Sequence, residues 1–322
     1  MVQTTTISGV PIVKIGHGLM SMSCVPEPPS DEQCFESIIA GINSAPPGVK
    51  VFLNAGEFYG TASNINANLE LLNRFFTKYP QYAERTFLSV KGAVVVSEHG
   101  FAWDSSPAGL ERSINNIIQK LGPNKKVDLF EPARIGAFTV LIPKFLLKKP
   151  WLYSVNMLNR VGKVAAVEIE VSFWSYEEET RKVIAKAAEI GAVVAAYSPL
   201  GQGVLTGSLN PTQLHKDDYR NHFPRFQEEA FKNNMKLVDA LKIIAEKKNI
   251  TPAQLCLAWV SSLAPHVVPI PSSTRAARTL ENVSTASVEL SEQDHEEIKH
   301  AMELNPVSGD RYAKEIMKSV WG

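Results

Sequence analysis

Short apolar segments, each ending on small or polar residues, recur along the chain. They consist largely of Val, Ile, Leu, Phe and Ala, with few polar interruptions. Nearly continuous apolar runs of this length indicate strands that are buried on both faces, as in a parallel sheet covered by helices. The predicted strands span 12–20, 50–56, 87–94, 126–133, 165–172, 191–199 and 266–273.

Segments with apolar residues at helical spacing lie between most of these runs. Strands that alternate with helices predict parallel β-α units, which form either a (β/α)8 barrel or an open, doubly wound sheet. The chain has neither the G-x-G-x-x-G turn of an open dinucleotide-binding sheet nor a P-loop. Polar side chains gather where the predicted strands end, which is the end of a barrel that carries the chemistry. We therefore expect one α/β domain, a (β/α)8 TIM barrel over residues 1–322, with helices at 66–79, 108–122, 177–191 and 231–249.

One interval breaks this order. Between Pro132 and Val167 the chain has no Asp or Glu, and the interval is shorter than the roughly 60 residues that two β-α units ordinarily take. Two explanations are open: a natural short variant, and a segment that was lost or misread, through a wrong splice or reading frame, which we favour. In both cases we expect an irregular or incomplete fifth β-α unit at residues 136–163, with the apolar run 138–143 as a substitute strand.

The charge balance narrows the classes of partner. Lys plus Arg and Asp plus Glu are equal at 33 each, which gives no electrostatic basis for binding nucleic acid or an anionic membrane. No apolar stretch reaches the roughly 18 residues that a membrane-spanning helix needs, and we see no pattern of a secretory signal. The cysteines are scattered and no His or Cys pair has metal-ligand spacing, so we expect no metal site and a reducing, cytoplasmic environment.

A tyrosine follows one predicted strand on a turn bracketed by glycines, in FLNAGEFYG (52–60). This segment is one of several motifs that occur in the same order in the aldo-keto reductases. The others are IGHGLMSMS, FLSVKGAV, DLFEPAR, AAVEIEVSFWS, AAYSPLGQGVLTG, VPIPSSTRAARTLEN and GDRY. The chain therefore resembles the aldo-keto reductase superfamily, most of all its fungal pyridoxal-reductase-like branch, over residues 10–315 except about 136–163. The resemblance implies a (β/α)8 barrel that binds NADPH without a Rossmann domain.

The resemblance places a proton donor and its partner on neighbouring strand ends. In the family, hydride from the nicotinamide attacks a carbonyl carbon, and the tyrosine that matches Tyr59 protonates the oxygen. A free tyrosine has a pKa near 10, and the cation of Lys91 is expected to lower it. Asn54 stands where relatives carry an aspartate, so we expect Lys91 to keep more of its charge and to lower that pKa further. Ala133 replaces the usual histidine; Arg134 beside it either stabilises the carbonyl oxygen or forms a structural salt bridge.

The resemblance also assigns the cofactor site. Relatives hold the nicotinamide carboxamide with a glutamine, where this chain has Glu168, and with a serine motif after the fifth strand, which this sequence lacks. The guanidinium of Arg278 suits a 2′-phosphate, which favours NADPH over NADH, unless it belongs to a solvated helix face. The expected contacts are Gly18 in the first strand, Tyr197 on the nicotinamide, Ser198, Leu200 and Gly201 along the pyrophosphate, Ser273, Thr274 and Arg278 at the 2′-phosphate, and Glu281 and Asn282 at the adenine.

Two functions are consistent with these residues. The first is an NADPH-dependent oxidoreductase that reduces an aldehyde or ketone group of a small molecule, pyridoxal-like or a fungal secondary metabolite, with Tyr59 as the proton donor. The alternative is a catalytically impaired or vestigial barrel protein that binds NADPH. Tyr59, Lys91 and the segment 273–282 favour the enzyme. Asn54, Ala133 and the absent serine motif favour the alternative. The sequence predicts neither the substrate nor the oligomeric state.

Overall fold

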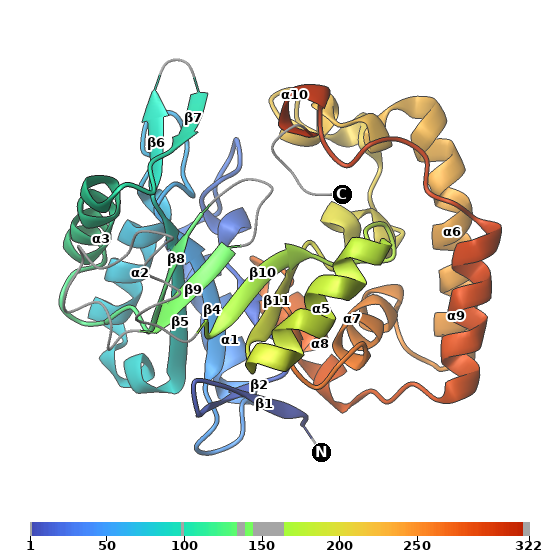
Figure 1. Ribbon diagram of the computed structural model, residues 1–322, viewed down its shortest axis with the longest axis horizontal. Coiled ribbons are helices and arrows are strands. Elements are labelled where there is room, and N and C mark those ends of the chain that lie inside the picture. The colour runs from blue at the N-terminus through green and yellow to red at the C-terminus, as the bar shows by residue number, and fades with distance from the viewer. Residues whose placement is uncertain (1, 98–99, 134–138, 144–163, 318–322) are drawn as a thin grey trace.

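The structure, a computed structural model, describes residues 2–97, 100–133, 139–143 and 164–317. In Figure 1 the strands form a curled sheet in the middle of the molecule, and helices pack around it. Eight strands lie side by side in the order β12-β11-β10-β9-β8-β5-β4-β3. In chain order they are β3 (His17–Gly18), β4 (Val51–Gly56), β5 (Thr86–Gly92), β8 (Leu129–Pro132), β9 (Thr139–Pro143), β10 (Ala166–Glu170), β11 (Val193–Tyr197) and β12 (Val267–Pro269).

The predicted alternation of strands and helices is confirmed. Apart from the two pairs that involve β9, all adjacent strands of this sheet are parallel, as the β-α pattern requires. This arrangement is an α/β barrel of the TIM type. The α-helices of the described residues are α1 (Asp31–Ser44), α2 (Ala67–Lys78), α3 (Pro107–Leu121), α5 (Glu178–Ile190), α6 (Glu228–Lys247), α7 (Pro252–Ser262), α8 (Ala276–Ser284), α9 (Glu292–Leu304) and α10 (Lys314–Met317).

Strand β9 runs antiparallel to both of its neighbours, with Ile142 opposite Phe130 of β8. The length of chain explains this direction. Only residues 133–138 lie between β8 and β9, whereas a parallel connection needs about a dozen residues or more. The apolar run 138–143 therefore provides a reversed strand in the fifth place of the row, and the predicted irregularity of the fifth unit is confirmed. The rest of that unit, 144–163, lies outside the described residues.

The two ends of the strand row meet. Gly18 N donates a hydrogen bond to Pro271 O at 2.9 Å, and Gly18 forms a parallel bridge with Ser272. A Cβ atom on Gly18 would lie 2.8 Å from the carbonyl oxygen of Ile270, which is closer than a side chain can approach. Glycine at this position therefore lets the first and last strands of the row come together.

Two hairpins lie at opposite ends of the barrel (Figure 1). The β1–β2 hairpin reaches the start of β4 through a bridge between Ile12 and Lys50, so it lies at the amino ends of the strands. The β6–β7 hairpin follows β5 directly. The predicted strand at 12–20 is divided between β2 and β3. The hairpin strands are β1 (Thr4–Ile7), β2 (Val10–Val13), β6 (Val94–Ser97) and β7 (Gly100–Trp103).

Buried apolar side chains lie on both faces of the sheet. One cluster, which includes Phe52, Leu129 and Val268, takes side chains from several strands and lies inside the barrel. Two larger clusters pack the strands against the outer helices. All residues of β4, β5 and β10 are buried, as expected for a sheet covered on both faces. Within the described ranges, none of the helices has the length and apolar character to cross a membrane.

Candidate active site

A cavity of about 1200 Å³ opens at the carboxyl ends of the strands. It brings together the predicted catalytic residues Asn54, Tyr59 and Lys91. Gly201 is buried and does not line the cavity, and Arg134 lies outside the described residues. The predicted cofactor residues that line it are Gly18, Glu168, Tyr197, Ser198, Leu200, Ser273, Thr274, Arg278, Glu281 and Asn282.

The turn after β4 sets the ring of Tyr59 at the cavity wall. Tyr59 N donates to Gly56 O at 3.3 Å, and the ring packs over Gly56. A Cβ atom on Gly56 would lie 2.8 Å from Cγ of this ring, so the turn requires a glycine before the tyrosine. Lys91, at the end of the neighbouring strand β5, places its Nζ atom 5.5 Å from the centroid of the Tyr59 ring. The two side chains that the sequence predicted as partners are therefore neighbours.

Lys91 is buried, and its ammonium group has polar neighbours from three other barrel strands. It donates a hydrogen bond to Asn54 Oδ1 and lies 2.8 Å from Glu168 Oε1. Asn54 Nδ2 donates to Glu168 Oε2 at 2.7 Å, which closes a ring of three side chains. Glu131 Oε2 on β8 is farther from Lys91 Nζ, at 3.6 Å. We call Asn54, Lys91 and Glu168 the Lys91 cluster.

The prediction that Asn54 leaves Lys91 without a neutralising partner is wrong. The carboxylate comes from β10, as Glu168, instead of from β4. Burial lowers the pKa of Lys91, but the negative charges of Glu131 and Glu168 outweigh burial and raise it. The pKa of Tyr59 is also raised, chiefly by burial and further by the charges of Glu168 and Glu131, although Lys91 opposes them. Tyr59 therefore holds its proton more tightly than a free tyrosine.

Glu168 also differs from the role that the resemblance gave it. Its Oε1 atom contacts Lys91 and its Oε2 atom accepts a hydrogen bond from Asn54. Both carboxylate oxygens are engaged within the Lys91 cluster. Its contact with a nicotinamide carboxamide therefore stays a prediction.

Glu131 is a residue of this site that the sequence reading missed. It is 0% exposed, and no described residue donates a hydrogen bond to either of its carboxyl oxygens. Burial, and then the negative charge of Glu168, raise the pKa of Glu131 well above its usual value. The sequence contains a sign of this residue, because Glu131 is an acidic residue inside the apolar run 126–133. A carboxyl group in a buried strand either faces a cation or keeps its proton.

Ala133, at the position where aldo-keto reductases usually carry a histidine, places only a methyl group at the cavity wall. Ala133 follows β8 and lines the cavity, and its side chain can neither donate nor accept a hydrogen bond. The role expected of Arg134 is untested because that residue lies outside the described ranges. In the part of the chain that the structure describes, no group of His, Cys, Asp and Glu is arranged to hold a metal ion.

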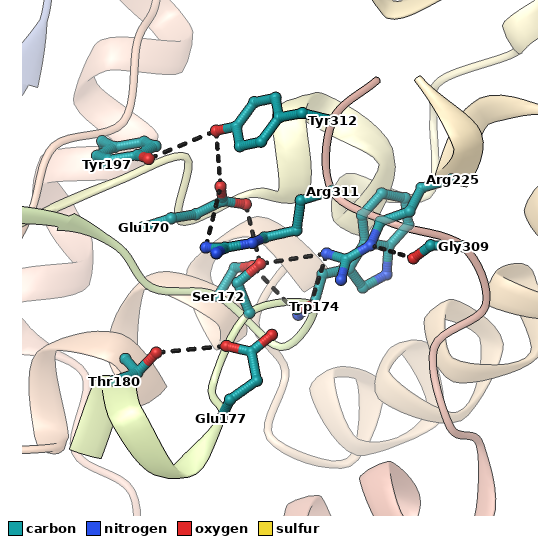
Figure 2. A network of polar contacts seen from close by, with 11 residues as sticks. Glu170, Ser172, Trp174, Glu177, Thr180, Tyr197, Arg225, Gly309, Arg311 and Tyr312 are labelled. Atoms are coloured by element: carbon teal, nitrogen blue, oxygen red, sulfur yellow. Dashed lines mark hydrogen bonds and ion pairs between the residues drawn. The ribbon is translucent and has the colours of Figure 1, made fainter. Parts of the chain in front are cut away.

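A second buried polar network lies at the ends of β10 and β11 (Figure 2). Tyr312 OH donates to Glu170 Oε2 at 2.8 Å and lies 3.4 Å from Tyr197 OH. Ser175 Oγ donates to Glu170 Oε1 at 3.0 Å, and Arg311 Nη1 lies 3.9 Å from Glu170 Oε2. We call Glu170, Ser175, Tyr197, Arg311 and Tyr312 the Glu170 cluster. It joins Tyr197, the predicted nicotinamide contact, to the segment after α9.

Arg225 fastens the same C-terminal segment to the barrel (Figure 2). Its Nε atom donates to Gly309 O at 3.0 Å, and its Nη1 atom donates to Trp174 O at 2.7 Å. Its guanidinium also lies 5.8 Å from the centroid of the Trp174 ring. These contacts and the Glu170 cluster together hold the GDRY motif (309–312) in position.

The loop after β11 has a backbone conformation that is rare for residues with a side chain. Ser198 and Gln202 have φ angles of 49° and 55°. Such conformations cost about 1–3 kcal/mol each and are concentrated at functional sites. Ser198 and Leu200 line the cavity, and their contact with a pyrophosphate stays a prediction. Gly201 shapes the loop instead, since a Cβ atom there would lie 2.8 Å from Cγ of Leu205.

The predicted 2′-phosphate residues lie together around the start of α8. Ser273 Oγ accepts a hydrogen bond from Arg275 N at 3.2 Å, and Thr274 Oγ1 accepts one from Gln33 Nε2 at 3.3 Å. Arg278 is exposed and lines the cavity, and none of the described carboxylates forms an ion pair with it. A guanidinium in this position, next to hydroxyl groups and a helix N-terminus, can receive a phosphate.

Comparisons with known proteins agree with the motif resemblance. A model of the Aldo/keto reductase family matches residues 151–303. A probable pyridoxal reductase of Schizosaccharomyces pombe is 27% identical over 96% of this chain and 97% of its own length. A putative pyridoxal reductase of Saccharomyces cerevisiae is 29% identical over 92% and 95%. The predicted resemblance is confirmed, and it indicates an enzyme of the oxidoreductase type.

Solved structures show the same fold at lower identity. A glycerol dehydrogenase from Gluconobacter oxydans has a TM-score of 0.74 and 17% identity, and the match covers 96% of this chain and 97% of that one. An aldo-keto reductase from Klebsiella pneumoniae, solved in complex with NADPH, has a TM-score of 0.62 and 17% identity over 97% and 98%. At this identity the likeness establishes the barrel fold alone.

Proposed function

We propose that this chain, which resembles the aldo-keto reductases, reduces an aldehyde or ketone group of a small molecule with hydride from NADPH and a proton from Tyr59. The observation that carries this proposal is the pairing of Lys91 with Tyr59 at the cavity wall, 5.5 Å from Nζ to the ring centroid. A lysine and a tyrosine on neighbouring strand ends at the exposed surface would not indicate catalysis. Here both line a deep cavity at the end of a barrel that carries chemistry.

The two side chains divide the proton chemistry between them. Tyr59 is protonated at neutral pH, because its pKa is raised, and it donates the phenolic proton as negative charge develops on the carbonyl oxygen. The phenolate that remains is stabilised by the ammonium group of Lys91. NADPH, when bound, supplies the hydride that reduces the carbonyl carbon.

The start of α8 fits the 2′-phosphate of this cofactor. Arg278 is exposed, lines the cavity and has no ion-pair partner among the described residues, and Ser273 and Thr274 line the same cavity just before α8. A relative in Schizosaccharomyces pombe that is 29% identical over 97% of this chain is named for NADP(+), and the Klebsiella pneumoniae structure contains NADPH. These observations support NADPH over NADH.

The walls of the cavity favour a flat, aromatic substrate. Phe58, Tyr219 and Phe223 line it together with Tyr59, and aromatic rings pack well against a planar ligand. The two relatives named as pyridoxal reductases support pyridoxal or a similar aromatic aldehyde. We further propose that residues 1–322 act as one domain and work in the cytoplasm.

A second candidate function is NADPH binding without reduction. Two observations favour it: Ala133 offers no polar atom to a carbonyl oxygen, and the pKa of Tyr59 is raised where a lowered one was expected. An acid that releases its proton less readily is a weaker donor.

Turnover separates the two functions. NADPH binding is measured by fluorescence titration of the full chain, and reduction by the loss of NADPH absorbance with pyridoxal and with benzaldehyde. Reduction that is lost in Tyr59→Phe supports the proposed function. Binding of NADPH with no turnover on either aldehyde would establish the second candidate instead.

A further inference from the structure

The Lys91 cluster is a closed ring with a defined polarity. Asn54 Oδ1 accepts from Lys91, Asn54 Nδ2 donates to Glu168 at 2.7 Å, and Glu168 returns to Lys91 at 2.8 Å. An amide has one acceptor end and one donor end. The ring therefore closes only if the amide stands between the cation and a carboxylate, as Asn54 does.

Of the two carboxyl groups near Lys91, the geometry gives the negative charge to Glu168. Each of its oxygens has an N–H donor, whereas neither oxygen of Glu131 receives a hydrogen bond from a described residue. Glu131 is 0% exposed and 3.6 Å from Lys91 Nζ. A buried carboxylate without donors is costly, so ionisation is resisted more at Glu131, and Glu168 is the principal partner of the cation.

The amide and the carboxylate of this ring are exchangeable. With an aspartate at position 54 and a glutamine at position 168, the ring closes again, because the amide of position 168 then donates to the carboxylate of position 54. Either change alone breaks it. Asn54→Asp sets a carboxylate oxygen against Glu168 across the present 2.7 Å contact, and Glu168→Gln removes the ion-pair partner of Lys91.

We propose that Glu168 is a positioning residue of the reaction: it neutralises Lys91 and holds the ammonium group beside Tyr59. Asn54 on β4 accepts a hydrogen bond from this ammonium group, and Glu168 on β10 supplies the negative charge. The inference rests on the proposed function and adds a residue to it. Glu168 acts through Lys91 and needs no contact with the substrate. The single carboxylate that relatives place at the position of Asn54 is thus replaced by a carboxylate on another strand, β10, beside the same cation.

The exchange is tested with four variants of the full chain: Asn54→Asp, Glu168→Gln, the double variant, and Glu131→Gln as the matched buried control. Two quantities are measured, the melting temperature without cofactor and the single-turnover rate of NADPH oxidation with pyridoxal. We expect each single variant of the Lys91 cluster to lose at least about tenfold in rate and about 5 °C or more in melting temperature. The double variant recovers most of both losses, because the two substitutions are coupled.

The control and the double variant decide the outcome. Glu131→Gln changes a carboxyl group that lies farther from Lys91 than Glu168 does, at 3.6 Å against 2.8 Å, so its losses are smaller than those of Glu168→Gln. Additive losses in the double variant would overturn the proposal, as would equal losses in Glu131→Gln and Glu168→Gln. If the wild-type chain reduces no aldehyde, the proposed function fails, and the melting temperatures still decide whether the ring can be reversed.

Discussion

The Lys91 cluster and the Glu170 cluster are built on the same strand but are held in different ways. Glu168 and Glu170 are both buried residues of β10, two positions apart. Glu168 is held by a cation at 2.8 Å, and all of its partners come from barrel strands. Glu170 is held chiefly by the hydroxyls of Ser175 and Tyr312, and Arg311 Nη1 lies 3.9 Å from its Oε2 atom.

The two clusters therefore have different tasks: one surrounds the proposed proton donor, and the other lies at the edge of the cavity. The Lys91 cluster places a charge beside Tyr59, and the sheet itself fixes its geometry. The Glu170 cluster places Tyr197 and depends on the segment after α9, which Arg225 fastens to the barrel. Substitutions in the first cluster should therefore change proton transfer, and substitutions in the second should change cofactor binding.

The largest expected effect is on proton transfer. Tyr59→Phe removes the proton donor, so turnover should fall by about 10²–10⁴-fold while NADPH affinity stays within a few-fold of wild type. Tyr197→Phe also removes one hydroxyl from the cavity and keeps the ring, so its rate should fall far less. Single-turnover rates with pyridoxal check the pair. Equal rate losses would show that the two tyrosines do not differ in function.

The next effect is on folding stability. Lys91→Met leaves Glu168 buried without its cation, and breaking a buried ion pair in this way costs about 3–5 kcal/mol. Arg311→Met should cost less, because Glu170 keeps its hydrogen bonds to Ser175 and Tyr312. Urea denaturation of both variants measures the difference. A larger loss in Arg311→Met would reverse the ranking of the two clusters.

Arg278 differs from the cations of both clusters because it is exposed and has no ion-pair partner among the described residues. Its substitution should spare stability and act on the cofactor alone. We expect Arg278→Ala to weaken NADPH binding by about 1.5–3 kcal/mol, the worth of a hydrogen bond to a charged group, and NADH binding much less. Fluorescence titrations with both cofactors check this. Equal weakening would show that Arg278 does not contact the 2′-phosphate.

The smallest expected effect is that of a substitution in the Glu170 cluster, at the edge of the cavity. Tyr312→Phe removes the hydroxyl that joins Glu170 to Tyr197, and it should cost about 1–2 kcal/mol of stability. NADPH affinity should fall with it, because Tyr197 loses its anchor, while the single-turnover rate at saturating NADPH stays near wild type. A lower rate with unchanged affinity would place Tyr312 in the proton chemistry.

The order of the strands was predictable, and one strand direction was not. The apolar run 50–56 became β4 (Val51–Gly56), and the helical pattern 66–79 became α2 (Ala67–Lys78). Apolar periodicity marks such elements well because they are buried. The run 138–143 carries no signal of direction, so β9 was predicted as a strand without its antiparallel pairing. The few residues that connect it to β8 determine the direction.

The sequence predicted which side chains lie together on adjacent strands, but not which lie together across the barrel. Tyr59 follows β4 and Lys91 lies near the end of the adjacent strand β5, so their motifs were enough to place them together. The charge of Lys91 was misjudged because its partner, Glu168, lies across the barrel on β10. No local pattern tells which carboxyl group lies opposite a lysine in space. The same holds for Glu131, whose burial without a hydrogen-bond donor among the described residues depends on the strands around it.

The central claim is that Tyr59 donates the proton and that burial and the carboxylates around Lys91 keep it protonated. The most direct test is the pH dependence of single-turnover NADPH oxidation with benzaldehyde, which has no ionising group of its own, in the wild-type chain, from about pH 6 to pH 10.5, across the ordinary tyrosine pKa near 10. Because the pKa of Tyr59 is raised, the acid form persists as the pH rises, and the rate constant should stay level through this range. A rate constant that falls with a midpoint below about pH 9 would show a donor with a lowered pKa, which would contradict the account.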